Sequence, residues 1–509
     1  MAIDATEAAR LTIQGRLDSA KTQAERNKLG QFATPTDLAT DVLTCARTLM
    51  PQGVPIRFLD PAIGTGSFYS ALVRVFPPDE IEDALGFDID SDVVREARQL
   101  WQHSPLRIKH GDFTQAAPPL DDDKKANLLI CNPPYVRHHH LSRDKKARLN
   151  GTTKLLSRVN LSGLTGLYGY FLCLSTSWMA RDGLAGWLIP SEFMDVNYGR
   201  QIKSFLLDRV TLLRIHRFNP EDTQFREALV SSAVVWFKNT SPPAGHYVEF
   251  TYGGTLIEPA ITKQVSADDL REFTKWTQFP RQNGKRRKQD GYRLADLFTV
   301  KRGLATGANE FFMLSPEQVA KHEIPDEFLT PILPSSRYLP DHEITADEKG
   351  EPILERKLYL LTCNLPESEV KAKHQALWRY FESGKSEGVH ERYLCKNRSP
   401  WYAQEDRPPA PLLCTYMGRQ NTGRGKPFRF ILNHSKATAA NVFLMLYPTP
   451  FLQTRLKTKP DLLRRIWLQL SQISIDDLTS EGRVYGGGLH KLEPKELGNV
   501  TLRSIIEEE

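Results

Sequence analysis

The sequence predicts an α/β protein, with a doubly wound, mainly parallel sheet in its first half and a mixed α/β domain in its second. Two observations indicate the sheet. Between residue 34 and about residue 240, short apolar runs alternate with segments whose apolar residues recur at helical spacing. The first four apolar runs also end in polar residues, which are Asp60, Asp88, Asp112 and Asn132. In a parallel sheet such residues meet at one edge, where ligands bind.

The elements of the first half have recognisable starts and ends. A helix is expected at Thr34 or Thr36, because either side chain can cap it and apolar residues follow at helical spacing. A second helix is expected to run to Phe76, and Ser91 can begin a third. The expected strands are 56–59, 84–87, 106–108, 127–131, 185–189 and 231–237, with a further helix at about 169–180.

Length and composition exclude several classes of protein. A chain of 509 residues is long enough for two or three domains, and its net charge of +6 is not that of a polycation. The first residues lack the order of a signal peptide, and no run approaches the roughly 20 apolar residues of a membrane span. Six cysteines without CxxC spacing predict neither a disulfide framework nor a zinc site. We therefore expect a cytoplasmic protein that binds no metal.

The expected domains are 1–240, a linker with a basic run at 241–295, and 296–509. Two local charge surpluses lie in the second half: residues 271–302 hold 10 basic and 3 acidic side chains, and residues 391–460 hold 12 and 3. Basic and aromatic residues alternate in the second block, a pattern suited to nucleic acid, although a solvated charged face is the alternative. The candidate DNA-binding residues are Lys285, Arg286, Arg287, Lys288, Arg398, Arg419, Arg424, Lys426 and Arg429.

A glycine-containing turn, Asp60 to Phe68, follows the first expected strand and opens a helix. It differs from the dinucleotide-binding pattern, because Tyr69 stands where the third glycine would be. Asp88 is placed to accept the hydroxyls of a ribose, and Asp112 to accept an adenine amino group. These residues suit a nucleoside-containing cofactor without a pyrophosphate. Each aspartate, taken alone, could instead be a helix cap.

The fourth strand ends in Asn132-Pro133-Pro134-Tyr135. Prolines donate no backbone hydrogen bond, so the tetrapeptide is expected to be a rigid turn that offers an amide, free carbonyls and an aromatic ring. It follows the glycine-containing turn and the two aspartates in a fixed order.

In this order the motifs resemble those of S-adenosylmethionine-dependent DNA methyltransferases that act on the N6 amino group of adenine, in the TaqI and Eco57I type class. Residues 30–35 look like the opening motif of that class, 167–171 like its aromatic helix start, and 303–309 and 483–494 like its recognition-domain segments. The length and the opening motif also resemble the PstI and BsuBI methylases. The resemblance implies a Rossmann-like class I methyltransferase fold with a C-terminal target-recognition domain.

The resemblance also implies a set of site residues. Asn132, Pro133, Tyr135 and Phe225 would be catalytic, with the two aromatic rings holding a base flipped out of the duplex. The implied cofactor is S-adenosyl-L-methionine, and its candidate binding residues are Thr34, Asp60, Ala62, Gly64, Gly66, Asp88, Ile89, Asp112, Phe113 and Phe171.

Double-stranded DNA is the implied partner of a protein that acts as a monomer, and a separate restriction endonuclease would cut the same site. The alternatives are methylation of RNA adenine, protein glutamine or cytosine N4. The run His138-His139-His140 is interpreted as a polar or phosphate-contacting loop rather than a metal site.

Overall fold

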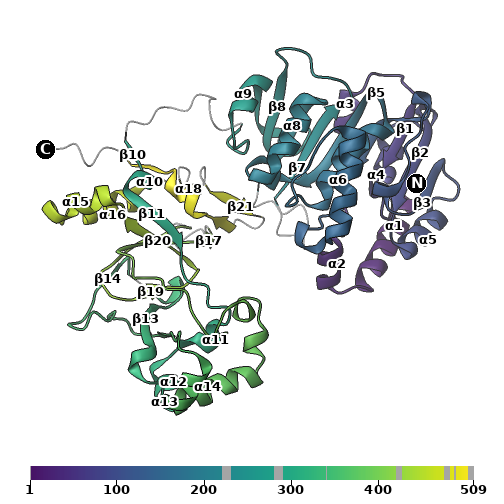
Figure 1. Cartoon of the computed structure of the whole chain (residues 1–509). Helices are drawn as coiled ribbons and strands as arrows, with labels where there is room; N and C mark the ends of the chain where they lie inside the picture. Colours follow the sequence, from purple (N-terminus) through teal and green to yellow (C-terminus); the bar gives the residue numbers. More distant parts are fainter. Residues whose placement is uncertain are drawn as a thin grey trace. The chain divides into compact units, whose positions relative to one another are not determined.

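A computed structural model of the chain describes residues 2–219, 231–279, 291–339, 341–419, 427–474, 478, 482–485 and 489–502. The chain divides into two compact units (Figure 1). The first unit comprises residues 1–286 with 485–487, and the second comprises residues 287–484 with 488–509.

The first unit is built on a nine-stranded sheet with the order β3-β2-β1-β4-β5-β7-β6-β8-β9. Its first five strands run parallel, and β7 lies antiparallel between β5 and β6. The chain order reverses at the boundary of β1 and β4, which is where ligands bind in sheets of this kind. The strands are β1 Ile56–Asp60, β2 Ile81–Asp88, β3 Leu106–His110, β4 Ala126–Cys131, β5 Met179–Pro190, β6 Thr211–Arg217, β7 Ser232–Lys238, β8 Tyr247–Gly254 and β9 Pro259–Ser266.

Helices cover the sheet on both faces (Figure 1), and its inner strands are therefore buried on both sides. Neighbouring strand residues belong to different cores: Phe58 and Leu128 pack in one, whereas Leu59 and Leu129 pack in the other. This alternation follows from the two-residue period of a strand. The doubly wound, mainly parallel sheet expected from the sequence is confirmed.

The α-helices described in the first unit differ from expectation in several places. Helices α1, α2, α6, α8 and α9 were not expected. The helix at 36–49 starts after Pro35 without a side-chain cap from Thr34 or Thr36, and the helix expected at 169–180 ends at Leu174 and continues as a 3-10 turn. The helices are α1 Ala2–Ser19, α2 Gln23–Leu29, α3 Thr36–Leu49, α4 Ser67–Val75, α5 Ser91–Leu100, α6 Arg143–Ser157, α7 Leu167–Leu174, α8 Arg200–Asp208 and α9 Ala267–Glu272.

The linker expected at 241–295 is largely part of the first unit. Strand β8 pairs in parallel with β6, β9 pairs with β8, and both belong to the nine-stranded sheet. The first compact unit thus extends beyond residue 240, because Val248 and Phe250 belong to the core under the sheet. Residues 280–290, with the basic run 285–288, lie outside the described part of the chain.

The second unit contains several small sheets, of which the largest has the order β11-β20-β16-β18-β14, and helices pack around them. The mixed α/β character expected for this half is confirmed. Its strands are β10 Tyr292–Arg293, β11 Phe298–Arg302, β12 Met313–Leu314, β13 Leu329–Leu333, β14 Glu343–Ile344, β15 Tyr359–Leu361, β16 Leu412–Thr415, β17 Met417–Arg419, β18 Phe430–Asn433, β19 Thr438–Ala439, β20 Phe443–Pro448, β21 Arg483–Tyr485, β22 Leu489–Lys491 and β23 Thr501–Leu502. Its helices are α10 Leu294–Leu297, α11 Asn309–Phe312, α12 Pro316–Lys321, α13 Glu367–Lys373, α14 Gln375–Ser386, α15 Pro450–Thr458, α16 Leu462–Gln472 and α18 Pro494–Gly498.

Three further features concern the chain as a whole. Within the described ranges, no helix has the length and apolar character that a membrane crossing requires. All six cysteines are buried and unpaired. Of the residues described, no three His, Cys, Asp or Glu side chains gather in a way that could hold a metal ion.

Candidate functional site

The turn after β1 is held by hydrogen bonds at both ends. The backbone N–H of Ala62 donates to Oδ1 of Asp60 at 3.0 Å, and the indole N–H of Trp101 donates to the carbonyl of Thr65 at 3.0 Å. Gly66 has a φ of +91°, and a Cβ there would lie 2.6 Å from Nε1 of Trp101. A glycine is therefore required at Gly66, both for its backbone conformation and for its contact with Trp101.

Asp88 links the end of β2 to this turn. Its Oδ2 accepts the N–H of Gly64 at 3.0 Å, and its Oδ1 accepts the N–H of Asp90 at 2.9 Å. A Cβ at Gly64 would meet no atom within 4 Å, so the turn is open to space on that side. Each carboxylate oxygen has capacity for a further hydrogen bond. Asp88 thus lies beside open space with acceptors available. It is not a helix cap; Asp90 caps α5 instead.

Asp60 is fully buried, and burial raises the pKa of its carboxyl to about 8, with the charge of Asp88 adding to the effect. Burial likewise raises the pKa of Asp88. Two carboxyls that both resist ionisation lie at the ends of neighbouring strands. Strongly shifted groups at a sheet edge are typical of a functional site, although structural networks also produce them.

Asp112 caps the short 3-10 helix that begins at Phe113. Such a capping role is the alternative to cofactor binding that the sequence leaves open for this residue. Its Oδ1 accepts the backbone N–H and the hydroxyl of Thr114, and its Oδ2 accepts the amide of Gln115. Burial acts to raise the pKa of Asp112, but these hydrogen bonds and Lys145 outweigh it and lower the pKa. A cap and a ligand are compatible roles, because a carboxylate can accept about four hydrogen bonds.

The apolar residues expected at the cofactor site divide into two kinds. Phe113 and Phe171 are both buried, with ring centroids 5.4 Å apart, and Phe113 also packs on Phe87 and Trp178. Ile89, by contrast, is 63% exposed and directly follows Asp88. The buried aromatic rings pack together near the ends of β2 and β3. The exposed side chain of Ile89 is available to contact a ligand.

The amide of Asn132, directly after β4, has a defined orientation. Its nitrogen donates to the carbonyl of Phe32 at 3.0 Å and to Oγ1 of the buried Thr34 at 3.1 Å. A carbonyl oxygen can only accept, so the NH2 group must face Phe32 and Oδ1 must face away from it. The segment before α3, one hundred positions earlier in the chain, therefore sets which atom Asn132 presents.

Two acceptors at this motif accept no hydrogen bond from the residues that the structure describes. They are Oδ1 of Asn132 and the backbone carbonyl of Pro133. Pro133 and Pro134 lack an N–H, so neither residue can donate a backbone hydrogen bond to these acceptors. A partner with two N–H groups on one nitrogen, such as an exocyclic amino group, would satisfy both acceptors.

Gly30 brings the opening segment against the tetrapeptide. The N–H of Tyr135 donates to the carbonyl of Gly30 at 3.1 Å, and Gly30 has a φ of +66°. A Cβ on Gly30 would lie only 2.4 Å from the nitrogen of Tyr135. Only glycine permits this approach, and the approach keeps Phe32 and Thr34 within reach of Asn132.

Tyr135 is buried, and its hydroxyl donates to the carbonyl of Leu188 in β5 at 3.1 Å. Its ring lies 5.8 Å from that of Phe32, with 47° between their planes. Burial raises the pKa of Tyr135, so its hydroxyl stays protonated. The ring is thus anchored at its far end. Phe225, the second aromatic residue expected to hold a base, lies outside the described residues.

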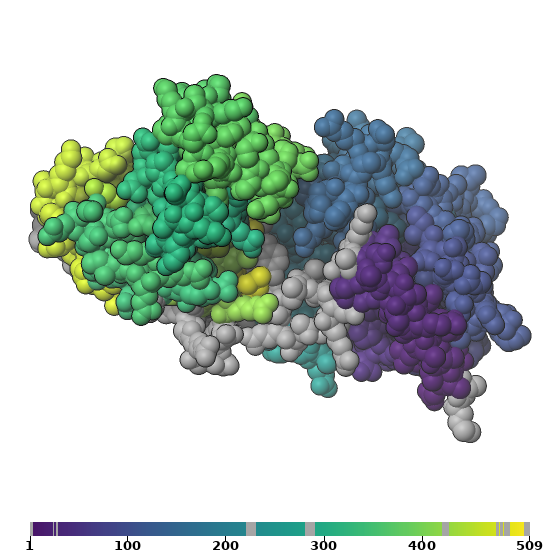
Figure 2. Space-filling model, turned by 90° about the horizontal axis from the view of Figure 1, so that it is seen from below, coloured from purple at the N-terminus to yellow at the C-terminus, as the bar shows by residue number. Residues whose placement is uncertain are grey.

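A buried ion pair that sequence reasoning missed supports the glycine-containing turn. Arg10 of α1 is 1% exposed; it pairs with Glu7 and donates to Oγ1 of Thr65 at 3.2 Å and to Oγ of Ser67 at 2.9 Å. Burial acts to raise the pKa of Glu7, but hydrogen bonds from Arg10, Ser70 and Thr36 hold it at about 2. Figure 2 shows the N-terminal residues, in purple, on the surface of the first unit.

The candidate DNA-binding residues fall into three groups. The guanidinium of Arg398 donates to the carbonyls of Ala305 and Thr306, and that of Arg429 donates to the carbonyls of Ser336, Leu339 and Asp341. These two arginines tie loops together, which differs from the role expected for them. Arg419 is exposed at the end of β17. Lys285, Arg286, Arg287, Lys288, Arg424 and Lys426 lie outside the described residues.

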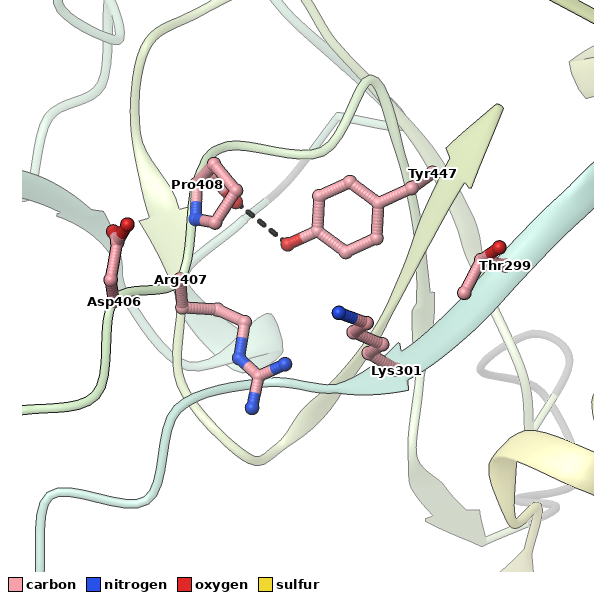
Figure 3. A pocket seen from close by; sticks show the side chains of 6 residues that line it. All are labelled: Thr299, Lys301, Asp406, Arg407, Pro408 and Tyr447. Atoms are coloured by element: carbon pink, nitrogen blue, oxygen red, sulfur yellow. Dashed lines mark hydrogen bonds between the residues drawn. The ribbon is translucent and has the colours of Figure 1, made fainter. Parts of the chain in front are cut away.

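The second unit also contains a pocket of about 230 Å³ beside β11 and β20 (Figure 3). The hydroxyl of Tyr447 donates to the carbonyl of Pro408 across it at 2.7 Å. Its two cations are Lys301 and Arg407, but Asp406 also lines it and Arg407 pairs with Glu405. The opposing charges leave no surplus to select an anion. The pocket is lined by Thr299, Lys301, Asp406, Arg407, Pro408 and Tyr447.

Both units match models of known families. Residues 77–225 match the Eco57I restriction-modification methylase family, and residues 283–509 match the C-terminal domain of the type II methyltransferase M.Eco57I. The resemblance to Eco57I-type restriction-modification methylases is confirmed. The first matched range contains Asp88, Asp112 and the tetrapeptide that begins at Asn132. The second matched range contains the second unit.

Relatives extend this similarity over nearly the whole chain. The chain is 27% identical to the type II methyltransferase M.XamI of Xanthomonas campestris pv. amaranthicola, over 94% of this chain and 86% of that one. It is 25% identical to M.AccI of Acinetobacter calcoaceticus, over 93% and 85%. The similarity to M.PstI of Providencia stuartii covers 49% of this chain at 23% identity.

The fold has a counterpart among solved structures. The type IIL restriction-modification enzyme MmeI, solved in complex with DNA, matches with a TM-score of 0.56 and 11% identity, over 91% of this chain and 64% of that one. This likeness concerns the fold alone. The family models and the relatives, by contrast, support a DNA methyltransferase of the restriction-modification type.

Proposed function

We propose that this protein transfers a methyl group from S-adenosyl-L-methionine to the N6 amino group of adenine in duplex DNA, as the modification enzyme of a restriction-modification system. The observation that carries the proposal is the pair of acceptors, Oδ1 of Asn132 and the carbonyl of Pro133. They stand at the end of β4, beside the point at which the strand order of the sheet reverses.

The acceptor pair explains how a poor nucleophile can react. The lone pair of an adenine amino group is delocalised into the ring. When Asn132 and Pro133 each accept one N–H, the lone pair is localised on nitrogen and directed at the methyl donor. The bond from nitrogen to the methyl carbon would form as the bond from that carbon to sulfur breaks, which would leave the donor as a neutral thioether, and the surplus proton of the amino nitrogen would pass to water. No strong base is needed, because positioning supplies much of the rate acceleration.

The residues around the ends of β1 to β3 fit the cofactor. Asp88 presents acceptors suited to ribose hydroxyls, the turn at Gly64 is open, and Asp112 can accept an adenine amino group. Ala62, Gly66, Ile89, Phe113, Phe171 and the fully buried Asp60 complete the proposed set. When bound, S-adenosyl-L-methionine supplies a methyl group already activated on a sulfonium.

The target amino group lies inside a DNA duplex, so the adenine must leave the base stack, at a cost of a few kcal/mol. We propose that the ring of Tyr135, together with Phe225, holds the extruded base. Base stacking on an aromatic ring contributes about 1–3 kcal/mol and so offsets much of that cost. The anchoring of Tyr135 through Leu188 supports this role, because a fixed ring loses little entropy when it binds.

Labelled methyl transfer followed by product analysis tests the proposal. Duplex DNA, RNA and protein are each incubated with the enzyme and cofactor labelled in the methyl group, and the DNA is digested to nucleosides. We expect label in DNA alone, in the nucleoside N6-methyldeoxyadenosine. Label in N4-methylcytosine, in RNA or in glutamine would identify one of the alternatives instead. Asn132→Ala is the matched control and should transfer nearly no label.

We further propose that the protein acts as a monomer on DNA and that a separate endonuclease cuts the same sequence. The family model that matches residues 77–225 is named for a restriction-modification methylase, which supports the second statement. Sedimentation of the protein with a short duplex should give one protein chain per duplex.

A further inference from the structure

A strongly basic segment follows the tetrapeptide directly. Residues 137–148, here called the basic segment, contain Arg137, Arg143, Lys145, Lys146 and Arg148 and a single acidic residue, Asp144. Three histidines, at 138–140, stand in the same stretch. Arg137, Arg143 and Arg148 are exposed. The segment comprises the short 3-10 turn His138–His140 and the first part of α6.

The cations of the basic segment have few acidic partners. In the described part of the chain, the side chains of Arg137, Arg143 and Lys146 form neither a hydrogen bond nor an ion pair. Lys145 and Arg148 have only one carboxylate near them, that of Asp112, at 3.8 and 3.9 Å.

Some other exposed cations of the first unit are paired at short range. Arg95 pairs with Asp92 at 2.7 Å, Arg107 with Asp83 at 2.6 Å, and Lys124 with Asp121 at 2.6 Å. The basic segment, with five cations and one acidic residue, carries a local positive charge next to the tetrapeptide. The pKa of His139 is lowered, first by burial and then by His140, His138, Arg137 and Lys146.

The segment is held next to the site. Val136, which separates the tetrapeptide from Arg137, accepts the N–H of Leu167 at the start of α7 with its carbonyl at 3.0 Å. Helix α6 begins at Arg143 with Ser142 as a side-chain cap. Arg137 is two residues from Tyr135, so their Cα atoms are at most about 7.6 Å apart. The start of the basic segment is therefore held close to the tetrapeptide by the bond between Val136 and Leu167.

We infer that the basic segment binds the phosphates that flank the target nucleotide, and that Arg143 and Lys146 are among the side chains that contact them. This inference rests on the proposed function. Extruding a nucleotide turns its backbone, and the phosphates on either side of it then need cations near the tetrapeptide. The five cations with one acid supply that charge, and the histidines are polar neighbours in the same stretch.

The salt dependence of binding tests this inference with a matched pair of variants. Each phosphate contact that is lost should make the slope of log affinity against log salt shallower by about 0.9. Arg143→Ala and Lys146→Ala should each do so, whereas Arg143→Lys should keep the wild-type slope. Lys154→Ala removes the same charge from an exposed position further along α6 and should leave the slope unchanged.

A second measurement locates the phosphates. A duplex with an uncharged methylphosphonate beside the target adenine should bind wild-type protein several-fold more weakly. The same replacement should have little further effect on Arg143→Ala, because the contact is already missing. Additive losses, or equal slopes for Arg143→Ala and Lys154→Ala, would overturn the inference.

The outcome separates this inference from the proposed function. If the wild-type protein methylates adenine in DNA while the variants keep its salt slope, only the inference fails. If the wild-type protein neither binds nor methylates duplex DNA, the proposed function fails first. Unchanged thermal unfolding of the variants shows that their fold is intact.

Discussion

At the scale of single residues, the orientation of one amide decides the chemistry. Asn132 could present either its oxygen or its nitrogen, and the carbonyl of Phe32 determines that the nitrogen is turned inward. The tetrapeptide therefore does not act alone. Its useful geometry depends on the opening segment, which Gly30 brings within hydrogen-bonding distance.

We expect the ring of Tyr135 to determine activity and its hydroxyl to affect mainly stability. Tyr135→Phe keeps the ring and should retain much of the activity, while losing about 1 kcal/mol of stability because the bond to Leu188 is gone. Tyr135→Ala should lose activity. Steady-state rates and thermal unfolding of both variants test this. If Tyr135→Phe is as inactive as Tyr135→Ala, the hydroxyl takes part in the chemistry and the stacking role is wrong.

The buried carboxyl of Asp60 predicts a pH dependence of stability. Its pKa is about 8 in the folded protein, against an ordinary value of 3.8 for an aspartate. Between these values the unfolded chain is ionised and the folded protein holds the proton, so this group makes folding less favourable as pH rises from about 4 to 8. Asp60→Asn cannot ionise. The melting temperature of Asp60→Asn minus that of wild type should therefore increase from pH 5 to pH 8, and a difference independent of pH would contradict this.

At the scale of elements, the sequence predicts those parts whose apolar residues recur regularly. The strands that end at Asp60, Asp88 and Cys131 are examples, since each combines a buried run with a polar end. Helix α1 is different, because its buried residues include Glu7 and Arg10, which apolar periodicity cannot reveal. Strand β9 is mostly exposed and polar, so it resembles a linker in sequence. Helix α1 packs on α4 and α5, and β9 pairs with the preceding strand β8, and the apolar pattern of the sequence displays neither contact.

Helix α1 should affect the cofactor through Arg10, which is a positioning residue. Arg10→Met removes the donors to Thr65 and Ser67 and leaves the buried Glu7 with the longer ion pair to Arg74, at 3.5 Å, so stability should fall by up to about 3–5 kcal/mol. The combination of Glu7→Gln with Arg10→Met removes the poorly compensated charge and should recover part of this stability.

The affinity for cofactor should not recover in the double variant, since the turn is still unsupported. Calorimetry should show about tenfold weaker binding of S-adenosyl-L-methionine, with DNA affinity close to wild type. Arg16→Met is the control on the same helix, because Arg16 pairs with Glu96 at an exposed position. Full recovery of cofactor affinity together with stability would mean that Arg10 has only a structural role.

At the scale of the whole molecule, the two family models match different parts of the chain. Residues 77–225 and 283–509 match separate family models, and the tetrapeptide lies in the first of these ranges. The basic residues of the second unit have unequal surroundings, which composition could not show. Arg398 and Arg429 donate to backbone carbonyls, whereas Arg419 is exposed.

This difference predicts opposite effects for two similar substitutions. Arg398→Ala removes the bonds to Ala305 and Thr306 and should lower the melting temperature of the protein. Arg419→Ala should leave the melting temperature unchanged and weaken DNA binding across sequences. Thermal unfolding and titrations with duplex DNA distinguish them. A stable Arg398→Ala variant that binds DNA poorly would instead indicate that Arg398 contacts DNA.

The central claim is that Asn132 acts on the reacting amino group rather than on binding. The direct test is the single-turnover rate of methyl transfer by Asn132→Ala, with cofactor and duplex DNA both saturating. Removing a hydrogen-bond acceptor that matters mainly in the transition state should slow this step by at least about 10²–10³-fold. Affinities for cofactor and DNA should stay close to those of the wild type. A rate within about tenfold of wild type, or a loss explained by weaker binding, would contradict the claim.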